Sequence, residues 1–243
     1  MSVWKIRDPK KNSNMKSLSC LLITTSNNKL DDCENKTGVW LEDLAAPYFI
    51  LKDNGEFITI ASPLGGQIPL DLNSQSAAAV TDSTKRFRQD AQAMYHFSHS
   101  LPLNEINTAA FDLLFIVGGY GAMWDFPDNK WLNEIIHNFH NDKKPIGLVG
   151  HAVAALVSLT TKDMQPFVQG IKLTAFSNDE ETSAALNEKP PFSLETRLIS
   201  LGALYSKGQD FKSYVVTHHN IVTGQNPASS AETARQIISL AQK

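Results

Sequence analysis

The sequence has little of what several large classes of protein require. Its 243 residues include only two cysteines, Cys20 and Cys33, too few for the disulfide framework of a secreted scaffold. No apolar run approaches the roughly 20 residues that span a bilayer. The net charge is −3 and the isoelectric point is near 6.2, which argues against a nucleic-acid or anionic-membrane surface. We therefore expect a soluble protein of a reducing compartment and predict a cytoplasmic location.

The first sixteen residues lack any apolar periodicity. They carry five basic residues and one acidic residue, and they have no apolar centre of the kind that a secretory signal needs. We predict a flexible N-terminal tail over residues 1–16 and a folded domain over residues 17–243. A targeting arm is the alternative for the tail, and only its basic charge supports that alternative.

From Ser17 onward the chain alternates β-rich runs with patterns of helical spacing. Helices are expected near residues 41–51, where Pro47 should kink or shorten the helix, and at 87–95, 128–139 (capped by Asp128) and 152–159. A capping box of Ser229 and Glu232 predicts a C-terminal helix. Strands are expected at residues 18–25, 57–62, 111–117, 145–149, 171–176, 214–217 and 221–223. The alternation predicts an α/β fold: a single doubly wound, flavodoxin-like domain whose mainly parallel sheet has helices on both faces.

In such a fold the ligand site lies at the carboxyl ends of the strands. Three loops meet that description, at residues 27–38, 118–125 and 150–151. The run from Pro145 to Leu156 reads as strand, abrupt turn and helix, with the small residues Gly147 and Ala152 where strand and helix must approach closely. This is the layout of a nucleophile elbow, but the turn residue is Gly150, which has no side chain. A plain strand–helix turn is the alternative.

Taken together, these segments resemble the ThiJ/PfpI superfamily of the class I glutamine amidotransferase-like fold, in its glyoxalase III and heat-shock chaperone-like branch. The resemblance covers almost everything from Lys16 to the C-terminus. Each motif alone is weak, and it is the ordered set that is specific. In chain order the motifs are Thr37–Tyr48 (TGVWLEDLAAPY), Ala61–Gly66 (ASPLGG), Gly118–Asp125 (GGYGAMWD), Tyr205–Gly208 (YSKG) and Thr223–Ser230 (TGQNPASS).

The resemblance implies a cofactor-free site with no metal, built from a Cys at the elbow, the His that follows it, and a Glu on the first helix. The Cys would add to an aldehyde or ketoaldehyde, and the Glu would move protons on the hemithioacetal to give a hydroxy acid such as lactate. The family Cys falls on Gly150 and the family His on His151. The family Glu falls on Asp43 rather than on Glu42.

The resemblance implies further site residues and a homodimer. Glu181 is the acid that would orient His151. The backbone N–H groups of Gly119 and His151 would hold the oxyanion. Cys33, Tyr120 and Trp124 are expected at the rim of the pocket.

Three positions depart from the family pattern. Gly150 cannot form a covalent adduct, although glycine suits a left-handed turn. Asp43 is one methylene shorter than Glu and is expected to stop about an ångström short of its target. Tyr120 stands where the family commonly has His. Either the protein has diverged naturally to a pseudoenzyme, or the residue at 150 is an introduced substitution; the changes at Asp43 and Tyr120 favour divergence.

Other candidate groups are weaker. Cys33 is either a displaced nucleophile or a loop thiol, and no base spacing supports the first. The pairs His96–His99 and His137–His140 have spacing that suits a metal, but nothing completes a ligand set, so we expect solvated helix faces. The glycines at 118–121 lack the pattern of a nucleotide-binding loop.

Three classes of function remain open. The first is an enzyme of the glyoxalase III, deglycase or amidase type, which Gly150 opposes. The second is a binding or chaperone-like protein with a stress-related role, whose partner is a small aldehyde or ketoaldehyde or an unfolded client protein. The third is an enzyme that uses His151 and Asp43 as acid and base without a covalent step. Of these, we favour a protein that lacks the family's cysteine chemistry.

Overall fold

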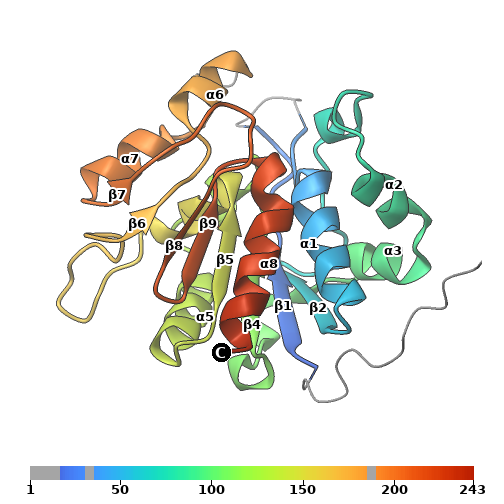
Figure 1. Cartoon of the computed structure of the whole chain (residues 1–243), viewed down its shortest axis with the longest axis horizontal. Helices are drawn as coiled ribbons and strands as arrows, with labels where there is room; N and C mark the ends of the chain where they lie inside the picture. The colour runs from blue at the N-terminus through green and yellow to red at the C-terminus, as the bar shows by residue number, and fades with distance from the viewer. Residues whose placement is uncertain (1–16, 31–35, 185–189) are drawn as a thin grey trace, which may run out of the picture.

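The computed structural model describes residues 17–30, 36–184 and 190–243, so the expected tail at residues 1–16 lies outside the described part (Figure 1). The strands are β1 (Ser19–Ile23), β2 (Phe57–Ser62), β3 (Leu101–Pro102), β4 (Leu113–Ile116), β5 (Ile146–Val149), β6 (Lys172–Leu173), β7 (Leu204–Tyr205), β8 (Val215–His218) and β9 (Ile221–Gly224). The α-helices are α1 (Leu41–Asp53), α2 (Asp82–Gln89), α3 (Ala91–Ser98), α4 (Ala122–Asp125), α5 (Lys130–Asn141), α6 (Asn178–Ser183), α7 (Leu194–Ser200) and α8 (Ser230–Ala241). Short 3₁₀ helices are η1 (Leu72–Gln75), η2 (Leu103–Glu105), η3 (Thr108–Ala110), η4 (Gly150–Leu156) and η5 (Pro227–Ser229).

Seven strands form one sheet in the order β3-β2-β1-β4-β5-β9-β8. All neighbouring strands are parallel except β8, which pairs antiparallel with β9 across the expected hairpin. Without the two-residue edge strand β3 and the antiparallel β8, the order β2-β1-β4-β5-β9 is the 2-1-3-4-5 order of flavodoxin-like folds. The predicted α/β fold with a mainly parallel sheet is therefore confirmed.

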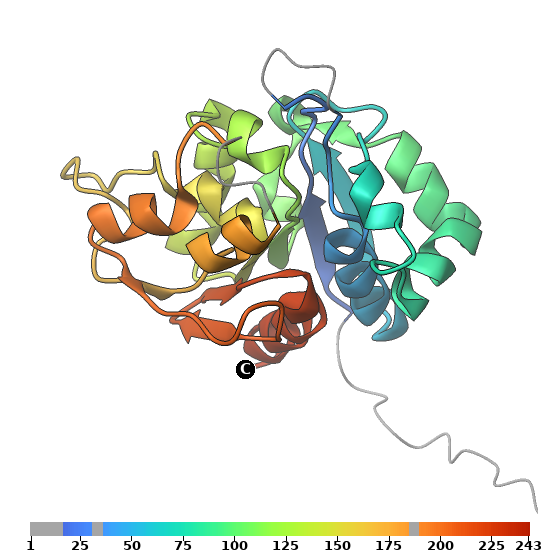
Figure 2. The same ribbon diagram turned by 90° about the horizontal axis from the view of Figure 1, so that it is seen from above.

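Helices cover both faces of the sheet, because alternate residues of the buried strands point to opposite sides. On one face, Leu22 and Phe115 share a core with residues of α1, α2, α3 and α8. On the other face, Ile23 and Ile116 share a core with residues of α4, α5, η4 and α7. Figure 1 shows α1 and α8 side by side on the first of these faces, and Figure 2 shows α2–α3 and α6–α7 at opposite sides of the molecule.

Glycine in β5 lets a helix lie close to the sheet. A Cβ built on Gly147 would lie 2.9 Å from Cδ2 of Phe115 and 3.2 Å from Cγ2 of Ile237 on α8. The sequence predicted a close approach between this strand and the helix that follows it, but at Gly147 the close neighbours belong to β4 and α8 instead. The packing fixes β5, and with it the turn that follows at Gly150.

Several local expectations were wrong, and hydrogen bonds explain two of them. The expected helix at residues 87–95 is two helices, because Asp90 has extended backbone (ψ 111°) and its side chain accepts the Ala93 N–H to begin α3. Asp128 does not cap α5, since its φ is 58° and the side chain of Asn129 accepts the Leu132 N–H instead.

The remaining corrections concern element type and length. Ser229 does not cap α8; its hydroxyl accepts the Tyr214 N–H and donates to Asn226. The helix expected at 152–159 is the 3₁₀ helix η4, and the strand expected at 171–176 is the short β6, which pairs with β7 outside the main sheet. Pro47 lies inside α1 without ending it. Among the described residues, no helix has the length and apolarity to cross a membrane.

Replacing Gly147 with Ala should lower the free energy of unfolding by about 1–3 kcal/mol, because the added methyl group has no room between Phe115 and Ile237. Gly55→Asn is the matched control. A side chain at Gly55 meets nothing within 4 Å, and Asn tolerates its φ of 86°, so its effect should stay below about 1 kcal/mol. Urea denaturation of both variants measures the difference, and equal effects would contradict the close-packing argument.

Candidate functional site

The turn after β5 has the geometry of an elbow. Gly150 has a φ of 57°, in the left-handed region that side chains other than glycine adopt at a cost. It directly follows the buried strand β5 and is the first residue of η4, at the turn that the sequence predicted. Among the described residues, a Cβ built there would meet one atom outside its chain neighbours, Oδ2 of Asp43, at 3.7 Å. Position 150 is thus free of crowding and lies beside a carboxyl group.

Asp43 lies in the first turn of α1 and is 2% exposed. Its Oδ1 accepts a hydrogen bond from the hydroxyl of Ser230 at 2.9 Å, while Oδ2 lies toward Gly150. The neighbouring Glu42 instead accepts a hydrogen bond from Thr81, so of the two acids it is Asp43 that reaches the elbow. Its carboxyl lies within van der Waals contact of a Cβ built at position 150, and whether the shorter side chain reaches a bound substrate stays a prediction.

Burial raises the pKa of the Asp43 carboxyl well above its usual 3.8, and the Ser230 hydrogen bond offsets this only in part. The negative charge of Glu42 raises the pKa further. Because desolvation disfavours the charged form, burial favours the neutral carboxylic acid at Asp43. A neutral acid can donate a hydrogen bond, which a carboxylate cannot.

His151, the residue after Gly150, pairs with Glu181 of α6. Its Nε2 lies 2.7 Å from Glu181 Oε1, and the Tyr120 hydroxyl donates to Glu181 Oε2 at 2.9 Å. The rings of Tyr120 and Phe176 both lie 4.6 Å from the imidazole, measured between centroids. The sequence placed Tyr120 at a rim, but the side chain is only 4% exposed and packs on His151. Burial and the adjacent Glu181 raise the pKa of the Tyr120 phenol, which therefore remains a donor.

The glycine loop after β4 closes the other side of the elbow. Gly118 lies against the Asp43 carboxyl and the Val149 carbonyl, where any side chain would collide. Gly119 has a φ of 124° and packs on the backbone of residues 38–40, so it is Gly118 that lies next to Asp43. The oxyanion role expected of the N–H groups of Gly119 and His151 stays a prediction.

The loops after β1 and β4 are joined by Asp125 at the end of α4. Its carboxylate accepts hydrogen bonds from the Thr25 hydroxyl at 2.8 Å and from the N–H groups of Ser26 and Asn27 at 2.6 and 3.0 Å. Burial nevertheless raises the pKa of Asp125 to about 6. Trp124, on the same helix, is half-buried with its ring 5.8 Å from that of Tyr120. Cys33, the remaining rim candidate, lies outside the described residues.

The structure thus brings Asp43, Gly150, His151, Glu181 and Tyr120 together from four segments: α1, the loop after β4, the turn into η4, and α6. Sequence reasoning missed two contacts of this set. Ser230, which bonds Asp43, was noted only as the end of a motif, and Phe176, which packs on His151, was assigned to a strand. Among the described residues, no three His, Cys, Asp or Glu side chains gather so as to hold a metal ion.

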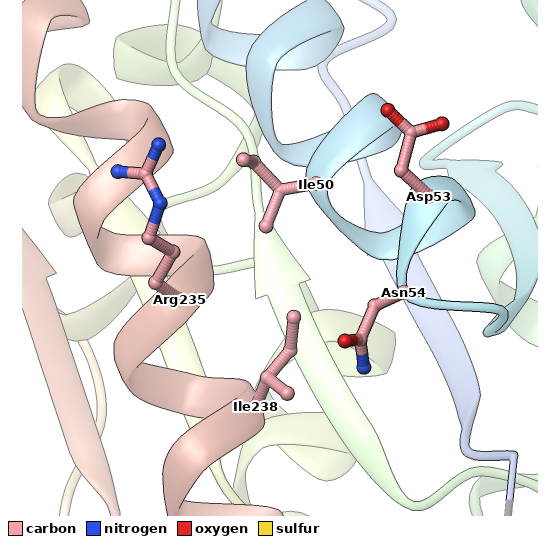
Figure 3. Close-up of a pocket in the computed structure, with 5 residues that line it drawn as sticks. All are labelled: Ile50, Asp53, Asn54, Arg235 and Ile238. Carbon is pink, nitrogen blue, oxygen red and sulfur yellow. The ribbon is translucent and has the colours of Figure 1, made fainter. Parts of the chain in front are cut away.

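A surface groove between α1 and α8 lies away from this site. It encloses about 350 Å³ and is lined by Ile50, Asp53, Asn54, Arg235 and Ile238 (Figure 3). Asp53 and Asn54 end α1, whereas Asp43 is in its first turn, roughly 15 Å away at 1.5 Å per residue. The carboxylate of Asp53 is already paired with Arg86.

Comparison with known proteins agrees with this geometry. The profile of the DJ-1/PfpI family matches residues 42–240, and the chain belongs to that family. It is 31% identical over 184 residues to glutamine amidotransferase-like class 1 domain-containing protein 1 of Bos taurus, covering 75% of this chain and 80% of the relative. It is 25% identical over 222 residues to the glutathione-independent glyoxalase HSP31 of Saccharomyces cerevisiae, covering 88% and 93%.

A solved structure with a similar fold is the rapid encystment protein of 24 kDa from Francisella tularensis. It has a TM-score of 0.88 and 33% sequence identity, covering 93% of this chain and all of that one. The resemblance to the ThiJ/PfpI superfamily that the motifs indicated is therefore confirmed at the level of the family.

Asp43→Asn tests whether the buried carboxyl is neutral. The pKa of Asp43 is higher in the folded protein than in the unfolded chain. Its contribution to the free energy of unfolding is therefore fully present below the unfolded pKa and is lost as pH rises through the folded pKa. An amide keeps the acceptor for Ser230 and cannot ionise. The free energy of unfolding of the variant should therefore lie within about 1 kcal/mol of that of the native protein at pH 4. Toward pH 8 the variant should become more stable relative to the native protein, as measured by urea denaturation.

Asp53→Asn is the matched control on the same helix. The hydrogen bonds and charge of Arg86 lower the pKa of Asp53, so its contribution is present above the unfolded pKa and is lost as pH falls. This control should be slightly destabilised at neutral pH and unaffected at low pH. An Asp43→Asn variant that is equally destabilised at every pH would contradict a neutral Asp43.

Proposed function

We propose that this protein is a glyoxalase III-type member of the DJ-1/PfpI family that binds a small aldehyde or ketoaldehyde at the elbow without the thiol chemistry of a cysteine enzyme. The observation that carries the proposal is Gly150, a residue with no side chain at the left-handed turn beside Asp43 and His151. A hemithioacetal needs a thiolate to form its C–S bond, and position 150 supplies none. The similarity to the yeast glyoxalase supports the substrate class.

The groups around Gly150 suit a carbonyl oxygen. In its protonated form Asp43 can donate a hydrogen bond at the turn, and His151, which follows Gly150, is held by Glu181. The rings of Tyr120 and Phe176 supply an apolar wall. Such a site would hold a carbonyl compound by hydrogen bonds and exclude most of the surrounding water.

A second candidate is an acid–base enzyme with no covalent step. The proximity of the Asp43 carboxyl to position 150 favours it, because a carboxylic acid with a raised pKa can pass its proton to a bound carbonyl at neutral pH. His151 would take a proton from the attacking water. In this version water replaces the thiol as the nucleophile.

Assembly and wider partners are further parts of the proposal. We expect a homodimer, as family resemblance implied. The remaining alternative to a small carbonyl ligand is chaperone-like binding of unfolded client proteins. A stable monomer at micromolar concentration in light scattering would contradict the dimer. If the protein suppressed the aggregation of a client protein and did not bind methylglyoxal, the chaperone-like alternative would be favoured.

The unmodified protein should convert no methylglyoxal to lactate, because the elbow has no thiolate. Gly150→Cys in a Cys33→Ser background should create a thiol that iodoacetamide alkylates rapidly, since the new side chain has open space beside His151. The remaining Cys20 is buried and burial raises its pKa, so it should stay unreactive. The variant should lose about 1–2 kcal/mol of stability because a side chain at φ 57° is strained.

Gly150→Ser in the same background is the matched control, with the same strain and no thiol. Adding Asp43→Asn to Gly150→Cys should leave alkylation intact but reduce any turnover gained, because the amide cannot give up a proton. Methylglyoxal turnover by the unmodified protein that Cys33→Ser leaves unchanged would overturn the binding proposal. If Asp43→Asn and His151→Ala then abolished that turnover, the acid–base candidate would stand in its place.

A further inference from the structure

A second cavity lies between the outer face of α5 and the loop that follows η4. It encloses about 530 Å³, within the range of roughly 300–1,000 Å³ that small-molecule sites occupy. The loop is a tight hairpin, in which the Thr161 N–H donates to the Gln165 carbonyl at 2.8 Å and the Met164 N–H to the Thr161 carbonyl at 3.0 Å. The lining residues are His137, His140, Asn141, Thr160, Thr161, Lys162, Asp163 and Phe167.

This cavity is separate from the elbow. His140 and Asn141 end α5, just before β5 begins at Ile146, whereas Gly150 directly follows the last residue of β5. The cavity therefore lies toward the amino end of the strand and the elbow at its carboxyl end. None of the residues that line the cavity belongs to the set around Asp43 and His151.

Two polar atoms on this side of α5 have no hydrogen-bond partner among the described residues, although the His140 side chain also bonds with Asn220. Nδ1 of His140 is buried with no hydrogen-bond partner, and so is Oδ1 of Asn133, two turns earlier on the same side of the helix. A buried polar atom without a partner is destabilising, so such atoms commonly mark a place for water or a ligand. The sequence predicted a solvated helix face at His137 and His140, but both are half-buried and pack edge-on against Phe167, with centroid distances of 5.9 and 4.9 Å.

The charges of the lining limit what can bind. Burial lowers the pKa of both His137 and His140, and a hydrogen bond with Asn220 offsets this in part for His140, so the neutral form of both imidazoles is favoured near pH 7. The exposed Lys162 and Asp163 at the mouth carry opposite charges that sum to zero. A multiply charged anion would lack compensation here. As they stand, the described His, Cys, Asp and Glu residues also form no group that could hold a metal ion.

What remains is a neutral lining with many groups that can both donate and accept. The two imidazoles, the amide of Asn141 and the hydroxyls of Thr160 and Thr161 all do so, and Phe167 adds an apolar ring at the base. We infer that this cavity is a binding site for a neutral, hydroxyl-rich small molecule of about the size of a monosaccharide. The ligand's hydroxyl groups would bond to the polar side chains that line the cavity, and its carbon skeleton would lie against Phe167.

Imidazole ¹H–¹³C resonances report on this site directly, with D-glucose and D-ribose as the probes. Each sugar should shift the His137 and His140 signals saturably at concentrations up to about 100 mM and leave those of His96 and His99 in place. Combining Asn141→Ala with Thr160→Val, which removes two hydrogen-bonding groups without touching the reporters, should weaken binding about tenfold or more. Asn54→Ala in the α1–α8 groove is the matched control and should leave the affinity for both sugars unchanged.

The rim variants Lys162→Gln and Asp163→Asn test the charge argument. Each should change the affinity for sugar less than about twofold, because a neutral ligand gains little from either charge. Absence of a saturable shift with both sugars would overturn the inference. So would tighter binding of inorganic phosphate that Lys162→Gln abolishes, or tight binding of Zn²⁺ that His137→Ala abolishes. These experiments report on a site remote from Gly150, so their result does not depend on whether the elbow binds methylglyoxal.

Discussion

The left-handed turn at Gly150 is the constraint around which the site is arranged. It reverses the chain directly at the end of β5, so that η4 starts beside the loop after β4 and the first turn of α1. That reversal works only because β5 is held rigidly, with Gly147 pressed between Phe115 and Ile237. Gly147 thus helps to position the strand, and Gly150 forms the turn.

Asp43 depends on the same arrangement. Its carboxyl is enclosed by Gly118, the Val149 carbonyl and the Ser230 hydroxyl, so three separate parts of the chain keep it out of water. The raised pKa of Asp43 is therefore a property of the assembled fold and not of helix α1 alone. Family membership is established, while the loss of a nucleophile at position 150 is our interpretation of a family pattern.

The sequence predicted the large-scale fold well because buried parallel strands are continuous apolar runs, and β2 was located to the residue at Phe57–Ser62. It failed where two polar residues competed for one helix start, as with Asp128 and Asn129, since only the backbone angles decide which side chain can reach the free N–H groups. In the site, His151 and Glu181 were found through their motif context. Ser230 was not assigned to it, because a contact across 187 residues leaves no local spacing to recognise. Phe176 was missed because its apolar run was taken for the end of a strand.

Helix α6 has only six residues, too few to be stable by itself, yet it carries two consecutive buried acids. Glu180 accepts hydrogen bonds from the Phe211 N–H and the Asn226 amide, while Glu181 accepts from Tyr120 and lies against His151. Because the two acids are neighbours in one short helix, the hydrogen bonds that Glu180 accepts help to fix the position of Glu181 beside His151. The imidazole is therefore anchored from outside the elbow as well as by the residues that contact it.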